Sequence, residues 1–185
     1  MSSRPVVLVP VVLVLGGARS GKSTFAESLA RRSGLRRLYV ATAEAHDAEM
    51  AARIAHHRAA RGEGWTTIEA PIALVATLTA EAGPGRVVLV DCLTLWLSNV
   101  MLAGHDAAVA TERLVAALAA AAGPVVLVSN EVGLSLVPET PLGRAFRDAQ
   151  GRLNQAVAAV ATDVVLVAAG QPLRLKPAAP VEITW

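Results

Sequence analysis

Short apolar runs alternate with longer stretches of mixed polarity along most of the chain. Five runs rich in valine and leucine each close on small or polar residues: Val11 to Leu15, Leu38 to Ala41, Val87 to Val90, Val125 to Val128 and Val164 to Val167. Continuous apolar runs of this length are typical of strands buried on both faces of a parallel sheet. The pattern therefore predicts five such strands, with weaker strand candidates at Trp65 to Glu69 and Leu173 to Leu175.

The segments between these strands are long enough for helices. We expect six of them, at about Lys22 to Arg32, Asp47 to Arg61, Pro71 to Ala82, Leu93 to Leu102, Ala107 to Ala122 and Pro141 to Ala161. The alternation of strand and helix predicts an α/β fold with a mainly parallel central sheet. No linker or low-complexity block interrupts it, so we expect one domain over 1–185, with 1–10 and 177–185 peripheral.

Composition and charge narrow the class of protein. Charged residues make up 17% and apolar residues 54% of the chain, which excludes intrinsic disorder and a coiled coil. The net charge is +2, and the chain has no dense run of basic residues that would indicate a surface for binding nucleic acid. A small anionic ligand is favoured instead. The single cysteine, Cys92, excludes an internal disulfide and a cysteine-rich zinc site, and is compatible with the reducing cytoplasm.

Two apolar segments suggest a membrane segment at first sight. The uncharged run 114–130 is divided by Gly123-Pro124 into a helix end and a strand start. Arg4 followed by the run 6–15 imitates a signal peptide, but its cleavage would fall inside the glycine-rich motif that follows. We therefore expect no membrane span and a cytoplasmic protein.

A glycine-rich loop follows the first predicted strand. Its residues Gly16-Gly17-Ala18-Arg19-Ser20-Gly21-Lys22-Ser23 match G-x-x-x-x-G-K-S, the pattern of a phosphate-binding loop, or P-loop. In such a loop backbone amides surround the phosphate oxygens, the lysine contacts the β- and γ-phosphates, and the serine hydroxyl ligates Mg²⁺. Of the 17 basic residues only Lys22 and Lys176 are lysines, which argues against a merely structural turn. The loop predicts a nucleotide site with Mg²⁺ as cofactor.

Two acidic residues follow other predicted strands. Asp91 closes the strand at 87–90, where P-loop proteins place the carboxylate that holds Mg²⁺. The alternative is an N-cap for the helix that starts after it, and one residue could do both. Glu131 ends another strand on the same sheet edge. It is the weaker candidate, because a loop carboxylate satisfied by backbone amides explains it equally well.

The type of nucleotide chemistry depends on the helix predicted at 47–61. A switch GTPase is excluded because the chain lacks N-K-x-D, which leaves a phosphotransferase, a nucleotidyltransferase or a nucleotide sensor. Arg53, His57 and Arg61 recur every four residues and share one helix face. A neutral imidazole there can attack phosphorus and form a phosphoramidate. By spacing alone an inert surface histidine remains the alternative, and His56 lies about 100° away around the helix.

Several blocks, in order, resemble the bifunctional adenosylcobinamide kinase / adenosylcobinamide-phosphate guanylyltransferases of cobalamin assembly. The resemblance runs from about Val11 to Lys176. It rests on the P-loop at 16–23, Tyr39 to Ala43, Asp47 to Arg58, Trp65 to Pro71, Val90 to Thr94, Ser129 to Gly133, Phe146 to Asp148 and Gly151 to Gln155.

The resemblance implies two reactions, a RecA-like P-loop fold in three layers and a homotrimer. A nucleoside triphosphate, ATP or GTP, phosphorylates adenosylcobinamide; GTP then guanylylates a histidine, which passes GMP to adenosylcobinamide phosphate. The family histidine falls on His57. The GTP site would include Ala41, Thr42, Ala43, Arg58, Ala59, Ala60, Arg61, Glu69 and Asp91. The competing interpretations are a single-activity small-molecule kinase and a non-catalytic nucleotide-binding regulator.

Overall fold

The sheet and the helices on its two faces define the architecture. The computed structural model describes residues 9–44, 52, 55, 58–59 and 61–177. Its strands are β1 (Val11–Gly16), β2 (Arg36–Ala41), β3 (Trp65–Glu69), β4 (Arg86–Asp91), β5 (Val125–Asn130), β6 (Asp163–Ala168) and β7 (Gln171–Lys176). They form one sheet in the order β3-β2-β4-β5-β1-β6-β7, and every neighbouring pair is parallel except β6 and β7.

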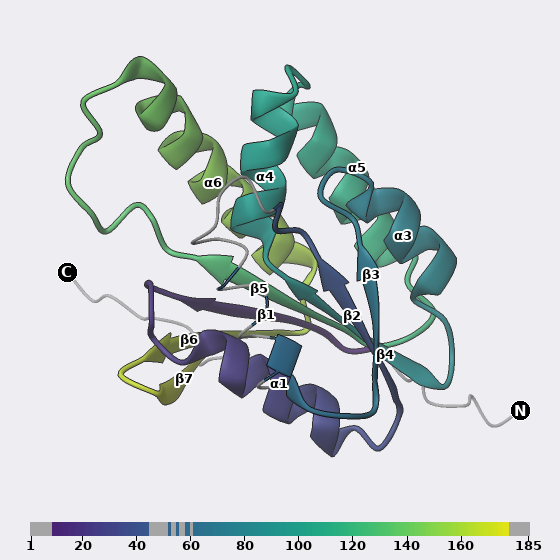
Figure 1. The fold of residues 1–185 in the computed structure, drawn as a ribbon. Coiled ribbons are helices and arrows are strands. Elements are labelled where there is room, and N and C mark those ends of the chain that lie inside the picture. Colours follow the sequence, from purple (N-terminus) through teal and green to yellow (C-terminus); the bar gives the residue numbers. More distant parts are fainter. Residues whose placement is uncertain (1–8, 45–51, 53–54, 56–57, 60, 178–185) are drawn as a thin grey trace, which may run out of the picture.

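The helices cover the sheet unequally. The described helices are α1 (Lys22–Arg32), α3 (Leu74–Glu81), α4 (Leu93–Leu102), α5 (Ala107–Ala119) and α6 (Pro141–Val160). Figure 1 shows α1 below the sheet and α3 to α6 above it, so the molecule has three layers. The predicted α/β class with a mainly parallel central sheet is therefore confirmed. The helix predicted at 47–61 lies partly outside the described residues; those described within it, such as Arg58 and Arg61, are helical.

Two apolar clusters hold the layers together. Leu13, Leu127 and Trp96 belong to the cluster between the sheet and the four upper helices. Val14 and Ala26 belong to the cluster between the sheet and α1. Neighbouring residues of β1 thus face opposite sides, as strand geometry requires, and both sides are buried. This double burial explains why the β1 sequence is continuously apolar instead of alternating.

The weaker strand candidates are both strands of the sheet. β3 pairs in parallel with β2 at the far edge. β7 returns antiparallel to β6 through Ala169 and Gly170, whose φ angles of 50° and 76° suit a two-residue hairpin turn. Pro172 lies on this edge strand, where a missing N–H costs least. In the described part of the chain, no helix has both the length and the apolar composition that a membrane crossing requires.

Gly123 provides a test of the packing where the α3–β4 and α5–β5 connections meet. Ala122 donates its N–H to Ala82 O at 2.9 Å, and a Cβ on Gly123 would overlap the Gly83 backbone. We predict that Gly123→Ala lowers the free energy of unfolding by about 1–3 kcal/mol, the usual cost of overpacking. Urea unfolding measures this. Gly133→Ala is the control, because a Cβ there meets no atom within 4 Å; an equal loss in both variants would contradict the prediction.

Candidate functional site

The P-loop joins β1 to α1 at the carboxyl edge of the sheet. β1 ends at Gly16 and α1 begins at Lys22. Arg19 and Gly21 have φ angles of 56° and 93°, and Ser20 donates its N–H to Gly17 O at 3.3 Å. The turn is tight, because a Cβ on Gly16 would lie 2.5 Å from Ser20 Oγ. Residues 16–23, predicted as one site from the sequence, thus form one compact turn that runs from the end of β1 into the first turn of α1.

Two backbone hydrogen bonds fix this loop from either side. Glu131, directly after β5, donates its N–H to Gly16 O at 3.2 Å. Gly170, in the turn after β6, donates its N–H to Ser20 O at 2.8 Å. Because β5 and β6 are the two neighbours of β1, the loop is held by both adjacent strands. The loop is therefore preorganised by the sheet.

The loop carries the groups that an anionic phosphate needs. The Ser20 hydroxyl is buried and has no hydrogen-bond partner among the described residues. Lys22 Nζ lies over the loop and donates to Gly17 O at 3.1 Å. The N-terminus of α1 adds the backbone N–H groups of the first helical turn and the positive end of the helix dipole. A buried hydroxyl without a partner, an ammonium and a helix N-terminus together fit a phosphate group.

Asp91 ends β4 beside the end of β2. Its register partner is Ala41, and its carboxylate lies close enough to the buried Tyr39 hydroxyl to affect the pKa of that group. Burial, with the negative charge of Asp91, raises the pKa of Tyr39 far above its ordinary value, so this hydroxyl stays protonated. The N-cap residue of α4 is Cys92, and no side chain caps that helix. The alternative role of Asp91 as an N-cap is therefore wrong.

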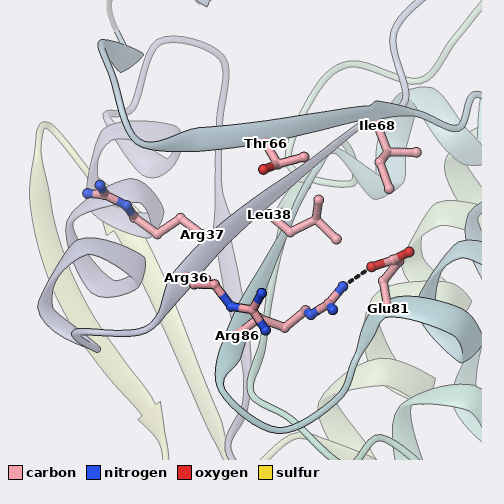
Figure 2. Close-up of a pocket in the computed structure, with 7 residues that line it drawn as sticks. All are labelled: Arg36, Arg37, Leu38, Thr66, Ile68, Glu81 and Arg86. Carbon is pink, nitrogen blue, oxygen red and sulfur yellow. Dashed lines mark hydrogen bonds and ion pairs between the residues drawn. The ribbon is translucent and has the colours of Figure 1, made fainter.

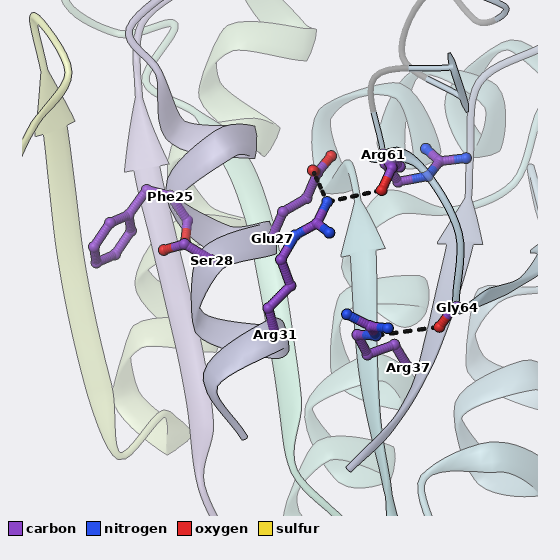
Figure 3. Close-up of polar contacts among 7 residues, drawn as sticks. All are labelled: Phe25, Glu27, Ser28, Arg31, Arg37, Arg61 and Gly64. Atoms are coloured by element: carbon purple, nitrogen blue, oxygen red, sulfur yellow. Dashed lines mark hydrogen bonds and ion pairs between the residues drawn. The ribbon is translucent and has the colours of Figure 1, made fainter. Parts of the chain in front are cut away.

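Arg61 packs against the Tyr39 ring. Its guanidinium lies 3.4 Å from the centroid of the Tyr39 ring, a cation–π contact, and the residue is only 5% exposed. Arg31 of α1 donates to Arg61 O at 2.8 Å and to Glu27 at 3.4 Å, as Figure 3 shows. Burial raises the pKa of Glu27 despite the neighbouring arginines. Arg61 thus connects the helix predicted at 47–61 to both the sheet and the P-loop helix.

Thr42 has a framework role that its sequence position did not indicate. It is fully buried, its Oγ1 donates to Cys92 O at 2.7 Å, and Cys92 N donates back to Oγ1 at 2.8 Å. Asn99 Nδ2 donates to Thr42 O at 2.8 Å. Thr42 therefore ties the end of β2 to the start of α4. The sequence predicted it only as part of a nucleotide site.

The other predicted site residues are distributed around the same edge. Ala41 ends β2, Ala43 follows it, and Glu69 ends β3 with an exposed side chain. Arg58 and Ala59 are helical and exposed. His57, Ala60 and Arg53 lie outside the described residues. No group of three or more histidine, cysteine, aspartate or glutamate side chains that could hold a metal occurs among the described residues.

Sequence analysis missed a buried polar network behind Glu131. Gln150 and Asn154, one turn apart on α6, bond to each other and to Ser129 at the end of β5. Asn154 Nδ2 then donates to Glu131 Oε1 at 3.0 Å. The available signal was the spacing: Gln150 and Asn154 lie four apart, on the helix face that also carries the buried Leu153 and Val157.

A hollow lies at the opposite, amino edge of the sheet. Figure 2 shows its lining from β2, β3, β4 and α3, with Arg36 and Arg86 at its rim. Arg86 forms an ion pair with Glu81 inside it. The hollow lies away from the P-loop and from the carboxyl ends of the strands, so it is not the predicted site.

Comparisons with known proteins point to one family. A family model described as "Cobinamide kinase / cobinamide phosphate guanyltransferase" matches residues 12–175. The chain is 51% identical over 166 residues to "Bifunctional adenosylcobalamin biosynthesis protein CobP" of Pseudomonas aeruginosa, covering 89% of this chain and 96% of that one. It is 41% identical over 181 residues to "Bifunctional adenosylcobalamin biosynthesis protein CobU" of Escherichia coli, covering 90% and 99%.

Two solved structures superpose on most of the chain. The RadB recombinase gives a TM-score of 0.48 at 17% identity, covering 85% of this chain and 73% of that one. The flagellar accessory protein FlaH from Methanocaldococcus jannaschii gives a TM-score of 0.44 at 13% identity, covering 85% and 72%.

The position of Lys22 predicts its contribution to nucleotide affinity. We expect Lys22→Ala to weaken binding of Mg²⁺-nucleotide about 10- to 100-fold, since a hydrogen bond to a charged group contributes about 1.5–3 kcal/mol. Isothermal titration calorimetry measures this, with circular dichroism to verify the fold. Lys176→Ala is the control, because Lys176 Nζ donates to Ala158 O and Ala159 O at the end of α6. If Lys22→Ala bound Mg²⁺-nucleotide as tightly as the unaltered protein, the prediction that the P-loop binds nucleotide would be wrong.

Because Cys92 is the one cysteine of the chain, the rate of thiol labelling reports on the burial of this residue. Cys92 is buried, and burial with the nearby Asp91 charge raises its pKa from 9.0 to about 11. We expect a thiol reagent at pH 8 to label the folded protein at least about 100-fold more slowly than the unfolded chain, because thiolate is the reactive form. As pH rises, the Cys92 thiol ionises in the unfolded chain at a lower pH than in the folded protein. The free energy of unfolding is therefore expected to fall as pH rises from about 9 towards 11. Rapid labelling of one equivalent in the folded protein would show that Cys92 is accessible.

Proposed function

The chain belongs to the cobinamide kinase / cobinamide phosphate guanyltransferase family, and from this premise we propose that it is a bifunctional enzyme of cobalamin biosynthesis. It transfers a phosphoryl group from a nucleoside triphosphate to the hydroxyl of adenosylcobinamide. It then transfers GMP from GTP, through a guanylylated histidine, to adenosylcobinamide phosphate, which gives adenosylcobinamide-GDP and pyrophosphate. The observation that carries the proposal is the identity of 51%, which extends over 96% of the relative.

The P-loop serves the kinase step. Phosphoryl transfer depends on positioning and on neutralising negative charge. The loop amides and Lys22 hold the triphosphate, and the Ser20 hydroxyl is available to the phosphate oxygens. Mg²⁺ would be held by Ser23 and Asp91, and it neutralises charge on the phosphates when bound. Two oxygen ligands suffice, because Mg²⁺ commonly completes its shell with water and substrate phosphates.

The second step uses the helix predicted at 47–61. His57 is the nucleophile: its nitrogen attacks the α-phosphorus of GTP, the bond to the pyrophosphate leaving group breaks, and GMP remains on the ring. Arg53, together with Arg61, neutralises the charge that develops on the phosphate. The anchoring of Arg61 on Tyr39 supports this assignment, since it ties the end of this helix to the carboxyl edge of the sheet.

The remaining features of the proposal follow from the family. Nucleotide contacts are assigned to residues around the same edge: Ala41, Thr42, Ala43, Arg58, Ala59, Ala60, Arg61, Glu69 and Asp91. The protein acts in the cytoplasm as a homotrimer on a small corrinoid and on nucleotides.

Covalent labelling distinguishes this proposal from a single-activity kinase and from a nucleotide sensor. Incubation with α-³²P-labelled GTP and Mg²⁺ is expected to leave an acid-labile, alkali-stable label on the protein, because a phosphoramidate hydrolyses in acid. His57→Ala is expected to lose the label, and His56→Ala, the neighbouring control, to keep it. Label that persists in His57→Ala and vanishes in His56→Ala would reassign the nucleophile; no label in the unaltered protein would refute the transferase step.

A further inference from the structure

Glu131 is fixed in place beside the P-loop. It directly follows β5, the strand that lies between β1 with the P-loop and β4 with Asp91. Its backbone N–H donates to Gly16 O at 3.2 Å, so its main chain is one hydrogen bond from the first residue of the loop. A carboxylate at this point lies at the carboxyl edge of the sheet, where open parallel sheets bind their ligands.

The side chain of Glu131 is oriented from inside the protein. Asn154 Nδ2 donates to Glu131 Oε1 at 3.0 Å. The Asn154 side-chain amide is held against a flip of its oxygen and nitrogen, because Oδ1 accepts hydrogen bonds from Ser129 Oγ at 2.6 Å and from Gln150 Nε2 at 2.9 Å. Ser129 and Gln150 are fully buried and Asn154 is 5% exposed. The direction of the Asn154 donor is therefore set by buried groups on two elements, β5 and α6.

A buried polar network of this size is not required to satisfy the hydrogen bonds of a loop carboxylate. Three buried polar side chains lie in an otherwise apolar layer, where burial of a polar group is costly unless it is hydrogen-bonded. Each makes at least one hydrogen bond, although Gln150 Oε1 is buried without a partner among the described residues. An ordinary loop glutamate is satisfied by water or by local backbone amides. Here Asn154 Nδ2 donates both to the Asn130 carbonyl oxygen, at 3.1 Å, and to Glu131 Oε1. The other carboxylate oxygen, Oε2, has no hydrogen-bond partner among the described residues. The network thus fixes the carboxylate of a residue whose main chain is hydrogen-bonded to the P-loop.

We propose that Glu131 is the catalytic base of the kinase step and that Asn154 is its positioning residue. This inference rests on the proposed function. The substrate hydroxyl oxygen forms a bond to the γ-phosphorus, and the bond from that phosphorus to the β,γ-bridging oxygen breaks, releasing the nucleoside diphosphate. The hydroxyl proton passes to Glu131 Oε2. Guanylyl transfer onto the histidine does not use Glu131, because its nucleophile is a neutral ring nitrogen.

The decisive variant is Glu131→Gln, which keeps an oxygen that accepts from Asn154 but cannot take a proton. We expect kcat of the kinase step to fall at least about 100-fold, the usual contribution of a general base. Transfer of GMP to supplied adenosylcobinamide phosphate and the affinity for Mg²⁺-ATP are expected to stay within twofold of the unaltered protein. Glu139→Gln, an exposed carboxylate of the same β5–α6 connection, is the control and keeps full kinase activity.

The role of Asn154 is tested by its dependence on Glu131. Asn154→Ala is expected to lower kinase kcat about 10-fold in the unaltered protein and to have no further effect in Glu131→Gln, since residues that act as a unit are not additive. An equal loss in both backgrounds would mean that Asn154 is only structural.

The outcomes separate the inference from the function it rests on. Kinase turnover in Glu131→Gln close to that of the unaltered protein overturns the assignment of the base, even if Asn154→Ala fails to fold. Absence of kinase turnover in the unaltered protein, despite nucleotide binding, instead refutes the proposed function.

Discussion

The geometry of the candidate site depends on two backbone hydrogen bonds that hold the P-loop between the neighbours of β1. Glu131 N–H binds the loop at Gly16 O, and Gly170 N–H binds it at Ser20 O. Both bonds exist only because β1 is an inner strand with β5 on one side and β6 on the other. That position requires burial on both faces, which the run from Val11 to Leu15 provides. Apolar burial in the sheet thus fixes the polar loop at its edge.

The polar groups around the loop are supported in the same way, from the interior outward. Asp91 lies near the buried Tyr39, whose ring packs against the Arg61 guanidinium. Glu131 is held by Asn154 through a network on α6 and β5. In each case a carboxylate at the strand ends lies beside a polar side chain that is itself buried. Preorganised groups of this kind need little rearrangement when substrate arrives, which is the main requirement of phosphoryl transfer.

Local sequence patterns predicted the elements well, and the contacts between them poorly. Helix α1 begins and ends as predicted, whereas β4 and β5 continue one and two residues further than predicted, to Asp91 and Asn130. Polar residues at the strand ends still pair in the sheet, so hydropathy alone ends the strands too early. The role of Thr42 depends on bonds to Cys92, 50 residues away. No local pattern encodes such a contact, whereas the P-loop is contiguous and was predicted whole.

One P-loop domain is expected both to phosphorylate and to guanylylate a corrinoid alcohol. The most direct test is mass spectrometry of the corrinoid after incubation of the purified protein with adenosylcobinamide, ATP, GTP and Mg²⁺. Adenosylcobinamide phosphate is expected to form first and adenosylcobinamide-GDP second, with one pyrophosphate released for each GDP adduct. Accumulation of the phosphate alone would contradict the proposed guanylyl transfer, and recovery of unmodified corrinoid would contradict both proposed reactions.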